Sequence, residues 1–523
     1  MQEQSLNEIV RRQARTQPDA VAYRTPVREW TFKQIDEESD RVAQGLKSLG
    51  VGPGHRVAAL TKYTAECVVL TVAANKIGAV CMPVNWRLAA PELEVIFRNG
   101  EARFLMVDGA FLPAARQTAA YGGMTVVATD SAEGLPSFAA WREGFPAVAT
   151  GYQPQGEETA LQLYSSGTTG LPKGVELSHA NLLSIFAELG AAFRYSADRS
   201  ILFNALPTFH IAGMGLALVT LAQGGQTVFY PDFDPPRIIA GIAQHRITHM
   251  FLVPAMILAL VNTPGVDKAD FSTLEVMAYG ASPISEKVLI DAMRVFKCGF
   301  LQVYGLTETT GAVTYLPAED HDPGGPRAYL LRAAGKPGVG VQLRIVDSAS
   351  GKDCADGQVG EVWIHTRQNM KGYWRNPEAT RQAFPEGHVD GIGWFRSGDA
   401  GYMRDGYLFL HDRIKDMIIS GGENIYPAEV ENALMQHPAV ADGAVIGVPD
   451  DKWGEAVKAC VVLKPGATAT EQEIVAFMRE RIAHFKCPKT VDFMTMLPRN
   501  PTGKLLKYIL RKPYWEGRDR QVS

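Results

Sequence analysis

The chain has 523 residues, of which 46% are hydrophobic and 21% are charged, and its formal net charge is −4. This length predicts two or more domains, and the composition is that of an ordinary globular protein. The slightly acidic balance argues against a nucleic-acid partner, which would favour a basic face. The 6 cysteines are scattered without paired spacing, which argues against zinc or a disulfide framework and favours a reducing cytoplasm.

No apolar run of about 18 residues is present, so no transmembrane segment is expected. The polar first residues do not resemble a secretory signal. Helices are expected over residues 5–18 and from Thr31, where Gln34 completes a capping box, to a glycine stop at Gly50.

Short apolar strands then alternate with helical segments, which favours an α/β fold with a largely parallel sheet. Helices are expected near 67–75, from Pro91 and from about Ser178. The expected strands cover 57–60, 80–84, 104–107, 161–164, 201–206, 250–253, 275–279 and 299–304.

The character of the sequence changes twice after this region. A β-rich stretch follows, with strands over 341–346 and 360–365 and a hairpin over 401–410. Beyond it we expect helices over 427–434 and 471–483, and strands over 444–448 and 456–463. We therefore expect a large N-terminal domain (1–412) of α/β layers with a β-rich subdomain, and a small α+β C-terminal domain (413–523).

The segment Tyr164–Gly174 concentrates hydroxyl side chains, glycines and a lysine within eleven residues. Glycines let backbone N–H groups turn toward an anion, hydroxyls add donors, and lysine adds a positive charge. The segment is not a Walker A loop, because Lys173 is followed by Gly174 and not by Ser or Thr. An expected strand precedes it and a helix follows it, an arrangement in which anions commonly bind.

Three further clusters carry chemistry. Gln302–Glu308 combines an aromatic residue that can stack on a purine with a carboxylate that can hold a hard cation. Trp394–Asp399 places a carboxylate after a glycine, where it can accept hydrogen bonds from a ribose diol. Pro498–Lys504 places a lysine on a Pro/Gly-rich loop. Each cluster alone is more often a turn or a solvated loop.

Together the four clusters resemble the motifs of the adenylate-forming superfamily, in order and spacing, over essentially the whole chain. Gly280–Pro283 and Gly372–Trp374 also fit the family pattern. The branch that is most similar is that of bacterial fatty-acyl-CoA and aryl-CoA ligases, because of the segment Lys415–Asn424. The resemblance implies an ATP-dependent enzyme that converts a carboxylic acid to an acyl-adenylate and then to an acyl-CoA.

The resemblance also implies roles for individual residues. Tyr304 would stack on adenine, Asp399 and Arg413 would hold the ribose, and Thr307 would contact the α-phosphate. The other implied nucleotide-binding residues are Ser165, Ser166, Gly167, Thr168, Thr169, Gly170, Lys173, Gly280, Ala281, Ser282, Gln302 and Gly305.

At the reacting centre, Lys504 resembles the lysine that bridges the carboxylate and the α-phosphate. Glu308, with the Ser165 hydroxyl, would hold Mg²⁺. Many relatives have Thr where this chain has Ser165, and serine keeps the oxygen but loses the stiffness of a β-branched residue. His210 matches a position that borders the acyl pocket near the carboxylate. We do not expect it to act as a general base, since no Asp or Cys partner is visible in the sequence.

Lys504 belongs to the small domain but must reach ligands of the large one, so the small domain is expected to be mobile. Lys415 matches the hinge of relatives, and Gly421 and Gly422 match the segment that lines the tunnel for coenzyme A (CoA). Relatives are often dimers, so the resemblance also admits a homodimer.

Three readings of the function remain open at this level. The first is an acid:CoA ligase. The second is a stand-alone adenylating enzyme that loads a carrier protein or, like luciferases, oxidises its adenylate. The third is a non-catalytic nucleotide-binding protein. The acid can be a medium- or long-chain fatty acid or an aromatic or cyclic acid. We expect the pocket wall near Phe209–His210, Val253, Tyr279–Gly280 and Thr310–Gly311. The small residues Gly280, Gly311 and Ala312 leave room for an acid larger than acetate.

Overall fold

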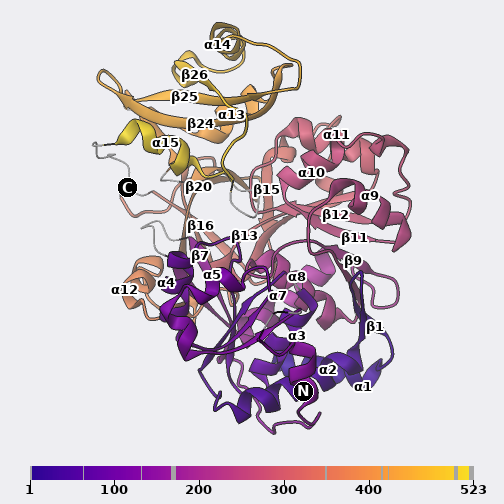
Figure 1. Ribbon diagram of the computed structural model, residues 1–523. Helices are drawn as coiled ribbons and strands as arrows, with labels where there is room; N and C mark the ends of the chain where they lie inside the picture. Colours follow the sequence, from indigo (N-terminus) through magenta and orange to yellow (C-terminus); the bar gives the residue numbers. More distant parts are fainter. Residues whose placement is uncertain are drawn as a thin grey trace.

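Two bodies of unequal size make up the chain, a large N-terminal one and a small C-terminal one (Figure 1). The structure is a computed structural model, and it describes residues 3–62, 64–130, 132, 134–166, 172–347, 350–413, 416–421, 423–499 and 505–516. The predicted fold class is confirmed: layers of helices and sheets form the large domain, and a separate domain follows it.

The largest sheet joins a parallel half to an antiparallel half. Its parallel strands are β1 (Val21–Arg24), β10 (Gln226–Phe229), β9 (Ile201–Asn204), β11 (His249–Leu252), β12 (Val276–Gly280) and β13 (Gly299–Leu306), and β2 (Glu29–Thr31) pairs antiparallel at the edge. The antiparallel half contains β14 (Gly311–Leu316), β15 (Ala333–Pro337), β21 (Tyr407–Arg413), β20 (Ile392–Arg404), β17 (Gly360–His365), β16 (Gln342–Val346) and β19 (His388–Val389).

A second sheet carries the phosphate-loop segment. Its parallel strands are β6 (Thr125–Ala128), β5 (Ala102–Val107), β3 (Arg56–Leu60), β4 (Val80–Pro83) and β7 (Thr159–Ser166). Two antiparallel strands complete it, β8 (Pro172–Ser178) and β18 (Gly372–Tyr373). The last strand comes from a much later part of the chain, so distant segments meet beside the loop.

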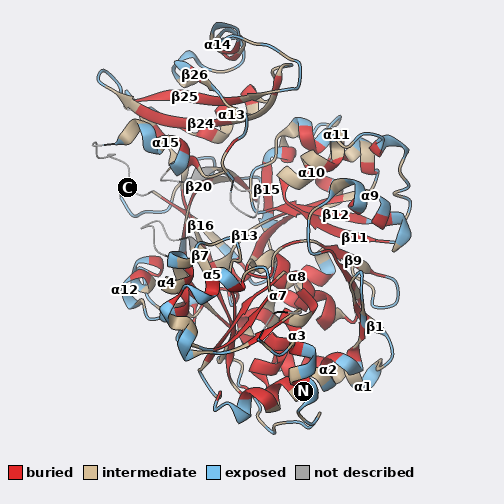
Figure 2. Ribbon diagram, viewed as in Figure 1, coloured by how far each residue is buried: buried red, intermediate tan, exposed pale blue. Residues whose placement is uncertain are grey.

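Helices pack on and between these sheets. The strands and the inner helix faces are mostly buried, and exposed residues lie in loops and on outer helix faces (Figure 2). The predicted capping box is confirmed, with Thr31 and Gln34 bonded reciprocally at the start of α2. The helix α3 is almost entirely buried, because it is enclosed by the main core. The helices of the large domain are α1 (Leu6–Thr16), α2 (Phe32–Ser48), α3 (Thr64–Asn75), α4 (Ala90–Gly100), α5 (Leu112–Arg116), α6 (Phe138–Glu143), α7 (His179–Ala192), α8 (Ile211–Gln223), α9 (Pro235–Gln244), α10 (Pro254–Val261), α11 (Glu286–Phe296) and α12 (Pro377–Ala383).

The small domain has its own sheet and its own apolar clusters. Its elements are β22 (Ile418–Ser420), β23 (Glu423–Ile425), α13 (Pro427–Leu434), β24 (Val440–Asp450), β25 (Gly454–Leu463), α14 (Glu471–Arg479), β26 (Thr490–Phe493) and α15 (Lys507–Trp515). Where we expected only a short tail, α15 is a helix held by ion pairs from Lys507 to Glu431 (3.1 Å) and from Arg511 to Asp416 (2.8 Å). Within the described ranges, none of the helices combines the length and apolar character needed to span a bilayer.

Candidate active site

Glu308 is the centre of a small group of hydroxyls between the two sheets of the large domain. The Ser165 hydroxyl donates to its Oε1 at 2.9 Å, and the Tyr373 hydroxyl donates to the same atom at 3.1 Å. The carboxylate is buried, and its backbone carbonyl accepts from Met370 N at 2.7 Å. Ser165 and Glu308, which the family resemblance placed together, are therefore in contact. Tyr373 is a further partner of Glu308 that sequence reasoning missed.

A single carboxylate with a hydroxyl fits Mg²⁺ as proteins usually bind it beside phosphates, with few protein ligands and the rest from substrate and water. In the described part of the chain, no three His, Cys, Asp or Glu side chains gather as a metal cage. The donor set is therefore that of a phosphate-associated cation, and a protein-enclosed structural ion does not fit it.

Tyr304 and Asp399 form a second pair. The Tyr304 hydroxyl donates to Asp399 Oδ2 at 2.7 Å, although the residues lie on β13 and β20. Asp399 is buried, and its N–H donates to the Ser397 hydroxyl at 3.1 Å. Its cross-strand partner on β21 is Arg413, so the two residues expected at the ribose lie opposite each other in register. The side chain of Arg413 lies outside the described part of the structure, as does that of Ser166.

Several expected site residues lie outside the described ranges, namely Gly167, Thr168, Thr169, Gly170, Lys415, Gly422 and Lys504. Their neighbours are described. Lys173 directs its ammonium over the Tyr373 ring, 5.0 Å from the centroid. Arg499 and Leu505, which flank residues 500–504, are joined by an antiparallel β-bridge.

The phosphate-loop segment connects two strands and not a strand and a helix, contrary to the expectation from sequence. After the loop the chain returns antiparallel along β7 as β8, and α7 begins only after Ser178 caps it. The residues 172–178 pair antiparallel with β7, from Leu161 opposite Leu177 to Ser165 opposite Lys173, which is the pairing of a strand. The helix N-terminus is therefore one strand away from the loop.

Arg56 contacts both strands of the hairpin formed by β7 and β8. Its guanidinium lies 3.3 Å from the centroid of the Trp374 ring and pairs with Glu176 of β8 at 2.8 Å. It also donates to Gln162 of β7 at 3.0 Å. The side chain is only 4% exposed, so these contacts are largely shielded from solvent. Arg56 thereby joins β3, both hairpin strands and the segment after β18.

Two residues near Tyr304 have uncommon backbone conformations. Ala281 has φ +67° and Thr310 has φ +56°, a region that L-residues other than Gly, Asn and Asp rarely occupy. At Gly305 a Cβ atom would lie 1.7 Å from the Gly311 carbonyl oxygen, so only glycine allows β13 and β14 to approach there. The neighbouring positions Gly280, Ser282, Gln302 and Thr307 belong to the same strand ends and turns.

Gly421 has φ +61° and donates its N–H to the Trp453 carbonyl at 2.8 Å. A Cβ atom there would come within 2.7 Å of the Trp453 ring. Both observations explain why glycine is required at this exposed turn of the small domain.

An apolar cavity opens beside the Tyr304 cluster. It has a volume of about 90 Å³ and lies between α7, α8 and strands β11, β13 and β14. Its lining includes Ala281, Gly305 and Thr310, which belong to the candidate nucleotide side. The two sites are therefore adjoining. The remaining lining residues are Leu182, Ile185, Phe186, Leu189, Phe193, Ile211, Ala212, Gly215, Leu216, Val219, Phe251, Val303, Gly311 and Ala312.

The lining agrees only in part with the expected pocket wall. Thr310, Gly311 and Ala312 do line the cavity. The expected wall residues that do not line it are Phe209, His210, Val253, Tyr279 and Gly280. Tyr279 packs in the core on the other face of the sheet, where its hydroxyl contacts His321 Nε2 at 2.9 Å. The face of α7 was missed because its apolar spacing is shared by any buried helix.

His210 is the N-cap residue of α8, next to the cavity residues Ile211 and Ala212. Its Nε2 atom is enclosed and has no hydrogen-bond partner among the residues that the structure describes. Burial, together with the nearby charge of Arg87, lowers the pKa of His210 to about 3, so the ring is neutral. An enclosed nitrogen without a partner fits a residue that faces a polar ligand group.

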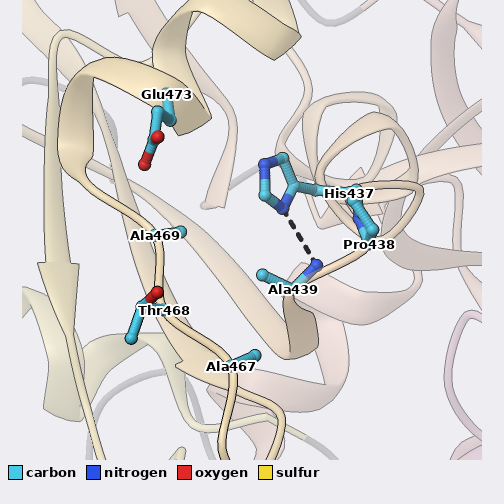
Figure 3. Close-up of a pocket in the computed structure, with 7 residues that line it drawn as sticks. All are labelled: His437, Pro438, Ala439, Ala467, Thr468, Ala469 and Glu473. Atoms are coloured by element: carbon cyan, nitrogen blue, oxygen red, sulfur yellow. Dashed lines mark hydrogen bonds between the residues drawn. The ribbon is translucent and has the colours of Figure 1, made fainter.

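A separate hollow of about 450 Å³ lies on the small domain, between His437–Ala439 and Ala467–Ala469 (Figure 3). His437 Nδ1 accepts there from Ala439 N at 3.2 Å, and Glu473 of α14 lies across the gap. The hollow contains none of the expected site residues, and the helix α14 beside it lies at the outer end of the small domain in Figure 1.

Comparison with protein families agrees with this geometry. Residues 10–374 match the family model described as AMP-binding enzyme. Residues 429–504 match the model of the AMP-binding enzyme C-terminal domain. The two matches fall on the large and the small body of the structure.

Two curated relatives align along nearly the full length of the chain. The fatty acid–[acyl-carrier-protein] ligase ScoC of Streptomyces coeruleorubidus is 38% identical, over 99% of this chain and 98% of its own. The long-chain-fatty-acid–CoA ligase FadD13 of Mycobacterium tuberculosis is 36% identical, over 97% of this chain and 98% of its own.

Two solved structures have the same fold. ATP-bound MatB from Rhodopseudomonas palustris superposes with a TM-score of 0.88 at 31% identity, over 98% of this chain and 99% of its own. The anthranilate CoA ligase AuaEII in complex with anthranoyl-AMP gives 0.89 at 28% identity, over 98% and 97%. The motifs, the fold and these matches agree, and the chain belongs to the AMP-binding enzyme family of adenylate-forming ligases.

Proposed function

We propose that this protein is an ATP-dependent acid:CoA ligase acting on an unbranched fatty acid. The observation that carries the proposal is the adjacency of two unlike sites. A polar group around Glu308, Tyr304 and Asp399 meets the mouth of an apolar cavity at Gly305 and Thr310. A carboxylate held at that mouth would have its tail in the cavity and its oxygens beside the nucleotide.

The chemistry has two steps. A carboxylate oxygen attacks the α-phosphorus of ATP, the bond to pyrophosphate breaks, and an acyl-adenylate forms. The sulfur of CoA then attacks the acyl carbon, its thiol proton leaves to solvent, and the bond to AMP breaks. The first step concentrates negative charge at the α-phosphate, so cationic groups placed in advance lower its barrier.

For the nucleotide, we assign Tyr304 to the adenine face, with Gly280, Ala281 and Ser282 along the base edge. Asp399 is suited to the ribose hydroxyls, because the Tyr304 hydroxyl fixes its carboxylate and the Ser397 hydroxyl accepts from its backbone N–H. Thr307 is assigned to the α-phosphate. The other assigned nucleotide contacts are Ser165, Ser166, Gly167, Thr168, Thr169, Gly170, Lys173, Gln302, Gly305 and Arg413.

We assign Mg²⁺ to Glu308 and the Ser165 hydroxyl. These two residues would hold the ion, which would offset the negative charge of the phosphates. Tyr373 is suited to a supporting role, since its hydroxyl bonds Glu308 Oε1. The same ring lies beside the Lys173 ammonium, so it connects the metal carboxylate to the hairpin.

Lys504 is assigned to the reacting centre, where it would bridge the acid and the α-phosphate. We place the division between the domains at 412/413, with Lys415 as the hinge. Rotation of residues 413–523 would bring Lys504 in for adenylation and then bring Gly421 and Gly422 to the CoA tunnel. We assign His210 to the wall beside the substrate carboxylate, because its enclosed Nε2 has no hydrogen-bond partner within the described ranges.

The depth of the cavity and its apolar lining favour a fatty acid over an aromatic one. The strand wall from the row of Gly305 to that of Leu301 spans four residues, or about 13 Å at about 3.3 Å per residue. A polymethylene chain can occupy the whole depth of this apolar passage, whereas a single aromatic ring would leave its lower part unfilled.

The experiment is acid-dependent exchange of pyrophosphate into ATP, followed by AMP release with and without CoA. Fatty acids are expected to support exchange, and CoA is expected to yield the thioester. Absence of exchange with every fatty, aromatic and cyclic acid would overturn the proposal and would favour a non-catalytic nucleotide-binding protein.

The identity to ScoC, whose name is that of a carrier-protein ligase, favours a second candidate function. In this candidate the same adenylate is transferred to the phosphopantetheine thiol of an acyl carrier protein. Both acceptors end in the same thiol, so the first half-reaction is common to the two functions. Exchange with fatty acids but no acyl-CoA, together with acylation of an added carrier protein, would identify the second function.

A further inference from the structure

We propose that Phe193 is the end wall of the acyl cavity and sets the longest fatty acid that the enzyme accepts. This inference rests on the proposed function, because it takes the cavity to hold the acyl tail. Phe193 is fully buried at the C-terminal end of α7 and lines the cavity.

The direction of the cavity follows from the sheet register. Gly305 and Ala281 lie at the carboxyl ends of β13 and β12, beside the candidate nucleotide site. Further down the same face, Phe251 is in the row of Ala278 and Leu301. His249 lies one side-chain repeat lower still, in the row of Val276 and Gly299. Phe251 lines the cavity, but His249 does not.

Phe193 occupies the place where the cavity stops. Its ring stacks on that of His249 with centroids 6.4 Å apart, and on that of Tyr195 at 5.7 Å. Tyr195 and His249 also stack on each other at 4.7 Å. Three rings therefore fill the space between the end of α7 and the start of β11, directly below the lowest cavity residues.

The end wall is held by hydrogen bonds as well as by packing. His249 Nε2 donates to the Phe193 carbonyl at 2.8 Å, and His249 Nδ1 lies 2.7 Å from the Thr248 hydroxyl. The Tyr195 hydroxyl lies 3.4 Å from that of Thr220 on α8. A wall fixed in this way resists displacement, so we expect a sharp limit on chain length and not a gradual decline.

The lining also selects the chemistry of the tail. The cavity residues are apolar except Thr310, whose hydroxyl donates to the Gln368 carbonyl at 2.5 Å. A hydroxyl or carboxylate at the far end of the acid would lose water and gain no partner. The ligand class is therefore a saturated or unsaturated monocarboxylic acid with an unsubstituted terminal methyl group.

The length of the lined passage gives the expected limit. At about 1.25 Å per methylene, as follows from a C–C bond of about 1.5 Å, a passage of about 13 Å holds about ten carbons. Octanoate to dodecanoate is therefore the expected optimum, and hexadecanoate is expected to be a poor substrate.

The test is the acid-dependent exchange of pyrophosphate into ATP, measured for even-numbered acids from butanoate to octadecanoate and for benzoate. It compares the wild-type protein with Phe193→Leu, Phe193→Ala and Gly215→Leu. Gly215 lies on α8 at mid-depth, and a Cβ atom there meets only Ile211 at 3.5 Å, so the larger side chain enters the cavity. Phe203→Leu is the matched control, since Phe203 is equally buried in the core on the opposite face of the sheet.

Both Phe193 variants should move the optimum to longer acids by two or more carbons, with about a tenfold gain in kcat/KM for the first acid beyond the wild-type limit. Gly215→Leu should move it to shorter acids, and Phe203→Leu should leave it unchanged. Phe193→Leu, which removes less volume, keeps the test valid if Phe193→Ala does not fold. Folding is checked by circular dichroism and thermal unfolding.

An unchanged chain-length profile in folded Phe193→Leu and Phe193→Ala would overturn the role of Phe193 while leaving the ligase function intact. A shift in the Phe203→Leu control of the same size would overturn it too, because the effect would then be a general loosening of the core. Exchange with benzoate alone, or with no acid, would instead overturn the proposed fatty-acid ligase and this inference with it.

Discussion

The nucleotide side and the acyl side of the candidate site differ in how their residues are distributed along the chain. On the nucleotide side, Glu308, Tyr304 and Asp399 come from two short motifs, and hydrogen bonds fix them. On the acyl side, the lining comes from faces of α7 and α8 and from residues of β11, β13 and β14. Polar chemistry needs particular groups at particular places, whereas an apolar wall needs only volume.

The largest effect of any substitution is expected at Lys504, the residue of the nucleotide side that is assigned to the reacting centre. Lys504→Ala should reduce adenylation by at least about 100-fold, the usual cost of removing one electrostatic group that stabilises a transition state. Thioester formation from synthetic acyl-adenylate should be spared. Rapid-quench assays of the two half-reactions provide the measurement, and Lys512→Ala on α15 is the control. Equal loss in both half-reactions would show that Lys504 has a purely structural role.

Glu308→Gln tests whether the buried carboxylate holds the cation. The amide keeps the shape but loses the charge, so adenylation should fall by about 100-fold. Titration calorimetry should show that Mg²⁺ no longer tightens ATP binding. The control is Glu319→Gln at an exposed ion pair. If the variant bound Mg²⁺ and ATP like the wild type, the assignment of Glu308 as a metal ligand would be wrong.

Asp399→Asn should have a smaller effect, confined to nucleotide binding. The amide retains one hydrogen bond but loses the charge, and hydrogen bonds to charged groups contribute about 1.5–3 kcal/mol. We therefore expect a KM for ATP about tenfold or more above the wild-type value, with little change in kcat. Asp405→Asn, in the exposed turn between β20 and β21, is the control. A fall in kcat at unchanged KM would contradict an assignment to the ribose.

The smallest expected effect is on folding stability, and it concerns His179, a buried histidine that packs in the core and has no assigned role in the reaction. Burial lowers the pKa of His179 to about 4, and its Nδ1 accepts from Leu6 N at 3.2 Å. Below about pH 6.5 the unfolded chain binds a proton that the folded chain refuses, so stability falls between about pH 6.5 and 4 and is unaffected above that range. The loss is on the order of 1–3 kcal/mol.

Urea unfolding of the wild type at pH 7.5 and at pH 5 measures this loss. His179→Gln keeps an acceptor for Leu6 but cannot be protonated, so its stability should depend less on pH. The exposed residue His484 gives the control His484→Gln, which should retain the wild-type dependence. An identical pH dependence in both variants would show that His179 is not the source.

The two sides also differ in how far they could be predicted from sequence. The resemblance to the adenylate-forming superfamily placed Ser165 beside Glu308, and their side chains do contact each other, while the α/β alternation located most strands. Tyr373 was missed because its contact depends on β18 pairing with β8. The α7 wall was missed because an apolar helix face looks the same whether it meets a core or a cavity. Tyr279 was assigned to the wrong side, since a strand sends successive side chains to opposite faces.

The pairing of β18 with β8 has a consequence for synthesis of the protein on the ribosome. Gly372 and Tyr373 cover an edge of β8 that has been exposed since residues 172–178 emerged. About two hundred residues must be added before that edge is covered, and at about 5–20 residues per second this takes on the order of ten seconds or more. An uncovered strand edge is prone to pair with other chains. A chain that stops before residue 372 should therefore aggregate, and chaperones that shield strand edges should matter most during this interval.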